Sequence, residues 1–99
     1  MRFKIVLAPE AVEDLRRVKA HVRAAVRVAL ETLLRHEPSK ASRSRSRIKR
    51  LRGVRRPQYR LRVDDFRVFY DVSGSTVEIL AIVAKSEAES WLAQFGNPE

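Results

Sequence analysis

The segment from Gln58 to Val72, QYRLRVDDFRVFYDV, constrains the fold more than any other stretch of the chain. Apolar and charged residues alternate on both sides of Asp64-Asp65, which is the pattern of two half-buried strands joined by a two-residue turn. The alternation and the turn length together set the strand pairing, with Arg62 opposite Arg67. The segment therefore predicts an antiparallel hairpin.

The predicted hairpin has one apolar face and one basic face. Like charges directly opposite each other destabilise a sheet, so the fold gains nothing from the paired arginines unless an anion lies between them. Guanidinium groups match phosphate oxygens bidentately, which favours an anion site. The alternative is a solvated face whose arginine stems cover apolar surface. The apolar face would carry Tyr59, Leu61, Val63, Phe66, Val68 and Tyr70, and the basic face Arg60, Arg62, Arg67 and Phe69.

The positive charge of the chain is concentrated in one segment. The net charge is +9, from 21 Lys and Arg against 12 Asp and Glu. Nine of the basic residues lie between Ser39 and Arg56, where no acidic residue occurs, and the other 12 balance the 12 acidic ones. Such a block favours a polyanionic partner, namely nucleic acid, an acidic protein or an anionic membrane, although a solvated linker has the same composition.

The residues before the basic block predict a strand followed by helical structure. Arg2–Ala8 alternates as a strand does, Pro9 suits the first turn of a helix, and apolar residues then keep helical spacing as far as Leu33. An unbroken helix over residues 9–36 would be about 40 Å long, whereas a domain of this size has a radius of gyration near ~13 Å. We therefore expect a break around Ala20, although the pattern leaves one helix or two open.

Three strands and a short helix are expected after the basic block. The strands cover residues 58–63, 66–72 and 76–84, and the last is apolar on both faces, as a central strand is. Ser86 suits an N-cap with Glu89 three residues later, and this helix would end at Gly96. With the N-terminal strand, these segments predict an α+β domain with a small, mostly antiparallel four-stranded sheet, an N-terminal helix or helical hairpin and a short C-terminal helix.

Length and residue types narrow the class of protein. The 99 residues suffice for one domain, residues 1–99. The chain has no cysteine, and His21 and His36 have no neighbour at metal-ligand spacing, so neither a metal nor another cofactor is expected. No apolar run approaches the ~20 residues that span a bilayer, and the N-terminus is unlike a signal peptide. We expect a soluble, cytoplasmic protein without a membrane partner.

Arginine and lysine would have to carry any catalysis. The sequence contains no glycine-rich phosphate loop and no hydrolase serine elbow. Basic side chains can stabilise the charge of a phosphoryl transition state and orient an attacking hydroxyl. RNA supplies its own nucleophile, the 2′-OH, but arginine serves poorly as a general base because it stays protonated.

The segments IKRLRG and YRLRVDDFRVFYDV, preceded by APEAVEDLRRV and followed by VEILAIVAK, resemble the RelE/ParE superfamily of bacterial toxins from type II toxin–antitoxin systems. The resemblance covers nearly the whole chain. It implies a small twisted sheet with the N-terminal helices packed on one face, and a cognate antitoxin that wraps the toxin in a hetero-oligomer. The RelE branch is favoured; its members are mRNA interferases, which cut mRNA in the ribosomal A site by attack of the 2′-OH on the adjacent phosphate.

The resemblance also implies roles for individual residues. Arg60 and Arg62 match strand residues that contact the scissile phosphate and help activate the nucleophile. Arg67 matches the strand arginine that stabilises the transition state. Lys85 lies beside the position where such toxins often place another basic group.

The C-terminal region departs from the pattern of these toxins. Ser86 occupies the position of the basic group, and Ser90-Trp91-Leu92 replaces an expected tyrosine. Trp91 can stack on a base, as aromatic residues do in RNA sites, or simply dock on the core. The basic residues expected to contact RNA are Arg43, Arg45, Arg47, Lys49, Arg50, Arg52, Arg55 and Arg56.

The leading hypothesis is therefore a ribosome-dependent endoribonuclease toxin with an atypical C-terminal catalytic region. The ParE branch offers an alternative, because its members target DNA gyrase and cut no RNA. A basic nucleic-acid-binding module without activity is the third hypothesis, since it fits the charge alone.

Overall fold

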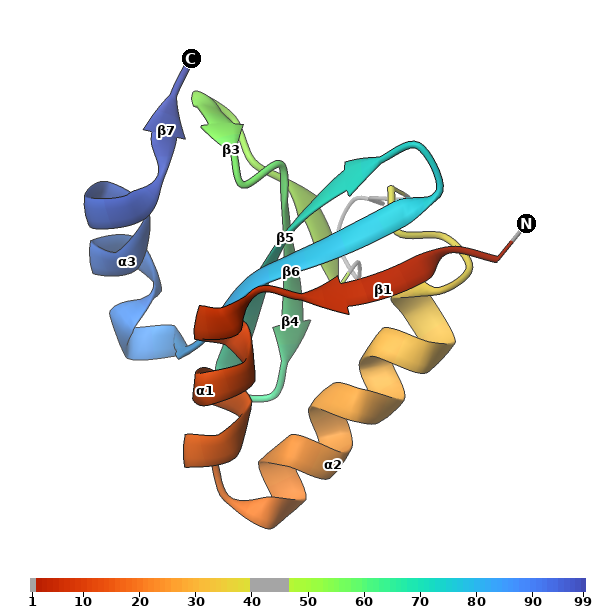
Figure 1. Ribbon diagram of the computed structural model, residues 1–99. Helices are drawn as coiled ribbons and strands as arrows, with labels where there is room; N and C mark the ends of the chain where they lie inside the picture. Colours follow the sequence, from red (N-terminus) through yellow and green to blue (C-terminus); the bar gives the residue numbers. More distant parts are fainter. Residues whose placement is uncertain (1, 40–46) are drawn as a thin grey trace.

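A five-stranded mixed sheet, with helices on both of its faces, organises the chain (Figure 1). The structure is a computed structural model, and it describes residues 2–39 and 47–99, so that Arg43 and Arg45 lie outside the described residues. The elements, in chain order, are β1 (Lys4–Leu7), α1 (Pro9–Arg17), α2 (Ala20–Ala29), the π-helical turn η1 (Leu30–Leu34), β2 (Ile48–Arg50), β3 (Val54–Arg56), β4 (Tyr59–Val63), β5 (Phe66–Ser73), β6 (Thr76–Ala84), the 3₁₀ turn η2 (Lys85–Glu87), α3 (Ala88–Phe95) and β7 (Asn97–Pro98).

The sheet confirms the predicted α+β class and corrects its strand count. The strand order is β1-β6-β5-β4-β2, in which β1 is parallel to β6 and the other pairs are antiparallel. The prediction of four strands was wrong because β2 forms within the basic block. Its only apolar residue, Ile48, is buried and pairs with Leu61, and one apolar residue is too few to produce a readable strand pattern.

The hairpin of β4 and β5 has the predicted register. Val63 pairs with Phe66 and Arg62 with Arg67. Asp64 takes a left-handed conformation with φ of 50°, which a two-residue turn requires and which aspartate tolerates better than most residues. The turn therefore forms without a glycine.

The N-terminal helical region is two helices rather than one. The break falls at Val18 and Lys19, whose backbones are extended with ψ of 158° and 154°, close to the expected position. Arg23 then reaches back to the open carbonyls at the end of α1: Nε donates to Leu15 O at 3.0 Å, and Nη2 donates to Arg16 O at 3.0 Å and Val18 O at 3.1 Å. A side-chain cap of this kind replaces the glycine that commonly ends a helix.

The core lies between the helices and the apolar face of the sheet. Val26 and Leu34 from the helical region meet Leu61, Tyr70 and Ile79 from the strands, and all five are buried. The hydroxyl of Tyr70 donates to Pro38 O at 2.6 Å, so that the chain after η1 is tied to the sheet.

The opposite face of the sheet is partly covered by the C-terminal residues (Figure 1). Trp91 on α3 stacks on Phe69 of β5 with ring centroids 4.8 Å apart, and β7 pairs with β3 as a separate two-stranded ribbon. The helix ends at Gly96 as expected. The capping prediction was wrong, because Ser86 lies inside η2 and the N-cap of α3 is Glu87, which makes no side-chain cap.

Candidate anion-binding site

Three arginines gather on the face of the hairpin that points away from the helices α1 and α2. Arg60 and Arg62 come from β4 and Arg67 from β5, and strand alternation puts all three side chains on the same face. Their exposure differs: Arg62 is exposed, Arg60 is partly buried and Arg67 is only 8% exposed. The three positions are therefore not equivalent for a ligand that approaches from solvent.

Arg67 is bound to the turn of its own hairpin. Its Nη1 donates to Asp64 O at 3.0 Å and to Phe66 O at 2.9 Å. The sequence left open whether the basic face is an anion site or a solvated surface, and both interpretations placed the Arg67 side chain on an open face. The structure instead buries this side chain. Its positive charge is held in place beneath the turn.

Arg60 has an unsatisfied donor beside two other cations. Its Nε is buried and has no hydrogen-bond partner among the described residues. Burial above all, and then repulsion by Arg67 and Arg62, lowers the pKa of the Arg60 guanidinium from its usual value, which still leaves it protonated at neutral pH. A buried N–H without a partner costs free energy, and a bound anion would remove that cost.

The carboxylates on this face neutralise a different residue. Asp71 Oδ2 lies 3.4 Å from Arg56 Nε, and Glu78 Oε1 lies 3.2 Å from Arg56 Nη2. Asp71 Oδ1 also accepts a hydrogen bond from Gln58 N at 2.7 Å. Within residues 2–39 and 47–99, no ion pair joins a carboxylate to Arg60, Arg62 or Arg67, so these three keep their charge.

Strand β2 and the residue before it add two basic residues next to the arginines. Lys49 pairs with Arg60 across the strands and is exposed. Arg47 is joined to Arg62 in both directions, since its Nε donates to Arg62 O at 3.0 Å and its carbonyl accepts from Arg62 N at 2.8 Å. We call Arg47, Lys49, Arg60, Arg62 and Arg67 together the arginine face.

The other predicted RNA-contact residues are distributed differently. Arg50 lies over the ring of Tyr59, 5.2 Å from its centroid, and Arg56 is held by the two carboxylates described above. Arg52 and Arg55 are exposed. Only part of the predicted set therefore adjoins the arginine face.

The two predicted site residues near the C-terminus have different surroundings. Lys85 is exposed, and its backbone N–H donates to Asp65 O at 2.7 Å, which puts it beside the hairpin turn. Trp91 is packed between Phe69 and Phe95. This packing is the docked arrangement that the sequence offered as the alternative to base stacking.

Sequence reasoning missed one hollow of the surface altogether. A groove of about 700 Å³ lies between the α1–α2 connection and the hairpin turn, and Phe66, Asp65 and Glu87 contribute to its lining. No spacing in the sequence could have indicated it, because its walls come from three distant segments. No group of three potential metal ligands occurs in the part of the chain that the structure describes, and no helix there is long and apolar enough to cross a membrane.

The fold is that of a small α+β protein, and the arginine face is its candidate anion-binding site. Residues 5–89 match the family of the ParE toxin of type II toxin–antitoxin system, parDE. The match covers most of the chain, so the protein belongs to this family of toxins, as the sequence resemblance indicated. No curated protein matches the chain.

Solved structures of related toxins share the fold. The RelB-RelE antitoxin–toxin complex from Methanococcus jannaschii contains a chain with 22% identity and a TM-score of 0.65, over 87% of this chain and 96% of that one. A chain of the RelBE2 toxin–antitoxin complex from Mycobacterium tuberculosis has 23% identity and a TM-score of 0.65, and the match covers 85% of this chain and 99% of that one. A chain of the YoeB dimer from Staphylococcus aureus has 17% identity and a TM-score of 0.62, and the match covers 84% of this chain and 97% of that one. At these identities the likeness concerns the fold alone.

Proposed function

We propose that this toxin is a ribosome-dependent mRNA endoribonuclease that binds the scissile phosphate at Arg60 and Arg62. The observation that carries the proposal is the uncompensated charge of the arginine face, with the buried and unpartnered Nε of Arg60 at its centre. A phosphate between Arg60 and Arg62 would accept their N–H groups and reduce the repulsion among the three arginines.

The chemistry would use the nucleophile of the RNA. The 2′-OH attacks the adjacent phosphorus, the bond to the 5′ oxygen of the next nucleotide breaks, and negative charge builds on the phosphoryl oxygens. Arg60 and Arg62 would stabilise that charge directly, because fixed donors cost no reorganisation at the moment of reaction. Arg67, held by two carbonyls of the turn, would add to the positive potential from below.

The arginine face contains no side chain that is well suited to act as the general base. Arginine stays protonated, and Asp71 is engaged by Arg56 and Gln58 N. We infer that the 2′-OH proton passes to water or to a group of the ribosome. This assignment explains why the activity would depend on the ribosome rather than on the toxin alone.

A cognate antitoxin is the protein partner proposed for this chain. The similar structures from M. jannaschii and M. tuberculosis were solved as toxin–antitoxin complexes, and membership of a toxin–antitoxin family supports the same kind of partner here. An acidic segment of that antitoxin would neutralise the arginine face.

Inhibition of DNA gyrase is the second candidate. The family that matches this chain is named after the ParE toxin, and the ParE branch of the superfamily targets gyrase. In that case the arginine face would bind a protein or DNA phosphates and no RNA would be cut. A gyrase assay on supercoiled DNA distinguishes the two: stalled cleavage complexes support the second candidate, and unaffected gyrase removes it.

Primer extension on translated mRNA after toxin induction tests the first candidate. We expect new 5′ ends with the wild-type chain and their loss in the double variant Arg60→Gln/Arg62→Gln. Arg16→Gln/Arg27→Gln is the matched control, because it removes the same charge from exposed positions on α1 and α2. Intact transcripts with the wild type, or equal cleavage by both double variants, would exclude the proposal.

A further inference from the structure

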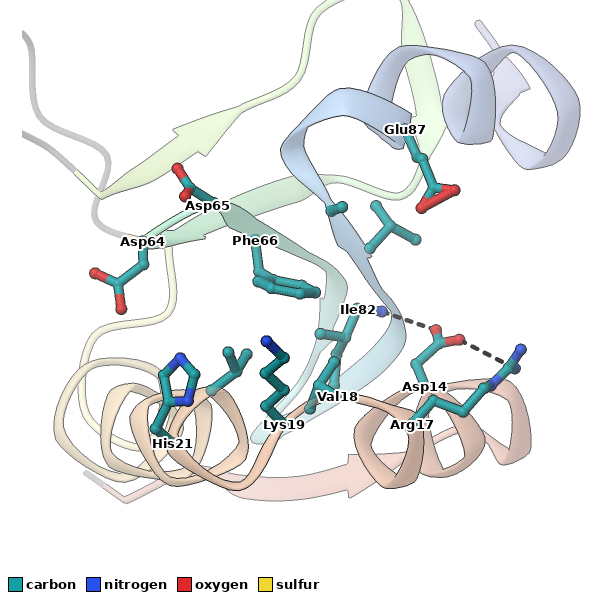
Figure 2. A pocket seen from close by; sticks show the side chains of 13 residues that line it. Asp14, Arg17, Val18, Lys19, His21, Asp64, Asp65, Phe66, Ile82 and Glu87 are labelled. Atoms are coloured by element: carbon teal, nitrogen blue, oxygen red, sulfur yellow. Dashed lines mark hydrogen bonds and ion pairs between the residues drawn. The ribbon is translucent and has the colours of Figure 1, made fainter.

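Phe69 on β5 lies on the same side of the hairpin as the arginine face, directly opposite Arg60. Side chains at directly opposite positions of two strands begin about 5 Å apart, so the ring of Phe69 adjoins Arg60. Phe66, the other phenylalanine of β5, belongs to the apolar face and points into the groove that Figure 2 shows. Phe69 is therefore the phenylalanine that lies beside the proposed phosphate position.

An aromatic ring next to a phosphate site suits single-stranded RNA, because a base stacks on the ring while a neighbouring phosphate meets the cation. In this structure the ring of Phe69 is 0% exposed. The indole of Trp91 lies parallel to it, with ring centroids 4.8 Å apart and an interplanar angle of 5°. The indole thus occupies the place that a stacked base would take.

The segment that carries Trp91 is acidic. Residues 88–99, which we call the C-terminal segment, comprise α3 and β7 and lie over the side of the sheet that bears Phe69 (Figure 1). The segment contains Glu89 and Glu99 and no Lys or Arg, in a protein of net charge +9. Because like charges repel, RNA bound at the arginine face would disfavour the docked position of this segment.

The C-terminal segment is loosely packed on the sheet. None of the residues of α3 is buried, and Phe95 is 58% exposed. A hollow of about 270 Å³ is lined by Trp91 and Phe95 from α3 and by Leu80 from β6. Side chains that border a hollow lose part of their dispersion contacts, and elements with little buried area are the first to open. The segment can therefore leave Phe69 while the sheet stays folded.

We propose that Phe69 is a base-stacking residue for single-stranded RNA, and that the C-terminal segment is an autoinhibitory element whose Trp91 covers it until RNA displaces the segment. The bound RNA would place a phosphate at Arg60 and Arg62 and an adjoining base on Phe69. The inference rests on the proposed function for its ligand and its phosphate position, but not on cleavage. Its consequence is that removal of the Trp91 side chain should strengthen RNA binding.

A fluorescein-labelled 2′-O-methyl oligonucleotide of about eight nucleotides measures binding by fluorescence anisotropy. It cannot be cut by attack of its own 2′ oxygen, which carries no proton. Trp91→Ala should bind it about threefold or more tightly than the wild type, and Phe69→Leu added to Trp91→Ala should abolish the gain. Weaker binding by Trp91→Ala would make Trp91 itself the stacking residue, and unchanged binding would make it a structural anchor; either result overturns the proposal. Amide spectra verify the fold of each variant.

A reversible lock tests the displacement itself. Val54 on β3 and Pro98 on β7 are partners in the antiparallel ribbon, and such positions are close enough for a disulfide. The chain has no cysteine, so Val54→Cys/Pro98→Cys forms a single bond under oxidation, which titration of free thiols verifies. With β7 fixed to β3, the C-terminal segment is held at both ends. The oxidised variant should therefore bind the oligonucleotide about threefold or more weakly than the reduced one, and equal affinities would overturn the proposal.

The emission of Trp91 reports its own position, because it is the only tryptophan of the chain. Saturation with unlabelled oligonucleotide should shift the emission to longer wavelength as the indole moves from Phe69 into water, and unshifted emission would contradict displacement. Primer extension stays a separate measurement. A wild type that shows these binding effects but cuts no mRNA would exclude the endoribonuclease alone, whereas cleavage with unchanged affinity in Trp91→Ala would exclude this inference alone.

Discussion

Arg60 has an unfavourable environment in the folded protein, and we propose that this environment serves phosphate binding. Its Nε is buried without a partner, and the charges of Arg67 and Arg62 oppose its own. Residues that serve a ligand are often unfavourable for the fold itself, because the protein without its ligand leaves their binding groups unsatisfied. Phosphate would supply the missing acceptor.

We expect Arg60→Met to raise the free energy of unfolding by about 0.5–1 kcal/mol, since a partly solvated guanidinium carries only part of the desolvation cost. Urea denaturation in a buffer without phosphate or sulfate measures the change. Arg55→Met, at an exposed position, should alter it by less than about 0.5 kcal/mol. Added phosphate should raise the Tm of the wild type and leave Arg60→Met unchanged. Destabilisation by Arg60→Met would contradict this account.

Tyr70 joins the core of the sheet to the segment that follows the helices. Its ring stacks on Tyr59 with centroids 5.4 Å apart, and its hydroxyl donates to Pro38 O. Burial, and to a smaller extent Tyr59, raises the pKa of Tyr70 above its usual value. The folded state therefore holds the phenol in its protonated form.

Tyr70→Phe should lower the free energy of unfolding by about 1–2 kcal/mol at pH 7, because the buried Pro38 carbonyl loses its donor. The raised pKa makes the tyrosine's contribution complete below the unfolded-state pKa near ~10 and progressively smaller at higher pH. The difference between wild type and variant should therefore shrink above about pH 10. Urea denaturation at pH 7 and pH 10.5 measures this, with Tyr59→Phe as the matched control.

At the scale of elements, the break between α1 and α2 depends on one side chain from the second helix. Neither glycine nor proline occurs at Val18 and Lys19, and Arg23 satisfies the last carbonyls of α1 in their place. The second helix thus supplies the cap of the first, which sets the two helices at an angle and keeps both against the sheet.

Arg23→Met should lower the free energy of unfolding by about 1–2 kcal/mol, because three carbonyls lose a charged donor at a partly solvated position. Arg27→Met, an exposed substitution on the same helix, removes the same charge and should cost less than about 0.5 kcal/mol. Urea denaturation of the two variants side by side measures the difference. Equal stability of the two would show that the cap is unimportant.

The C-terminal elements are held by few contacts. None of the residues of α3 is buried, and its attachment rests on the stack of Trp91 on Phe69 and on the pairing of β7 with β3. Elements with little buried area are the first to open in native-state fluctuations. Trp91 therefore holds α3 against the sheet in this structure.

At the scale of the whole molecule, the hairpin separates two surfaces of different character. The arginine face lies on one side of β4 and β5, and the groove begins at the other side of the same turn. The turn contributes Asp64 and Asp65 to the groove, while its carbonyls hold Arg67. One short segment therefore presents a basic surface and an acidic one.

The overall charge of +9 leads to a prediction about salt. Binding of a labelled single-stranded RNA should weaken steeply between 50 and 200 mM salt, because each phosphate contact releases bound counterions. Arg62→Gln should reduce the slope of log K against log salt by about 0.7. Arg27→Gln, on the helical side, should leave the slope unchanged. Fluorescence anisotropy at several salt concentrations provides both slopes.

The sequence predicted the hairpin and its register well because alternation and turn length are local properties. The pairing of Arg62 with Arg67 required only the two-residue spacing of Asp64-Asp65. Strand β2 was not predictable, since Ile48 becomes a strand residue only through its pairing with Leu61. The cap at Glu87 was also missed, because a 3₁₀ turn precedes α3 and moves its start past Ser86.

The sequence by itself determined the α+β class, the two faces of the hairpin and membership of the toxin superfamily, since each follows from the order and alternation of residues along the chain. It left open whether the N-terminal helical region is one helix or two. Only the tertiary structure decided which arginines face solvent. Arg67 binds the turn, Arg56 is taken by Asp71 and Glu78, and Trp91 covers Phe69. The contacts of Arg56 and Trp91 join residues far apart in the chain, and the free energies of all these contacts depend on burial and partners that no local pattern contains.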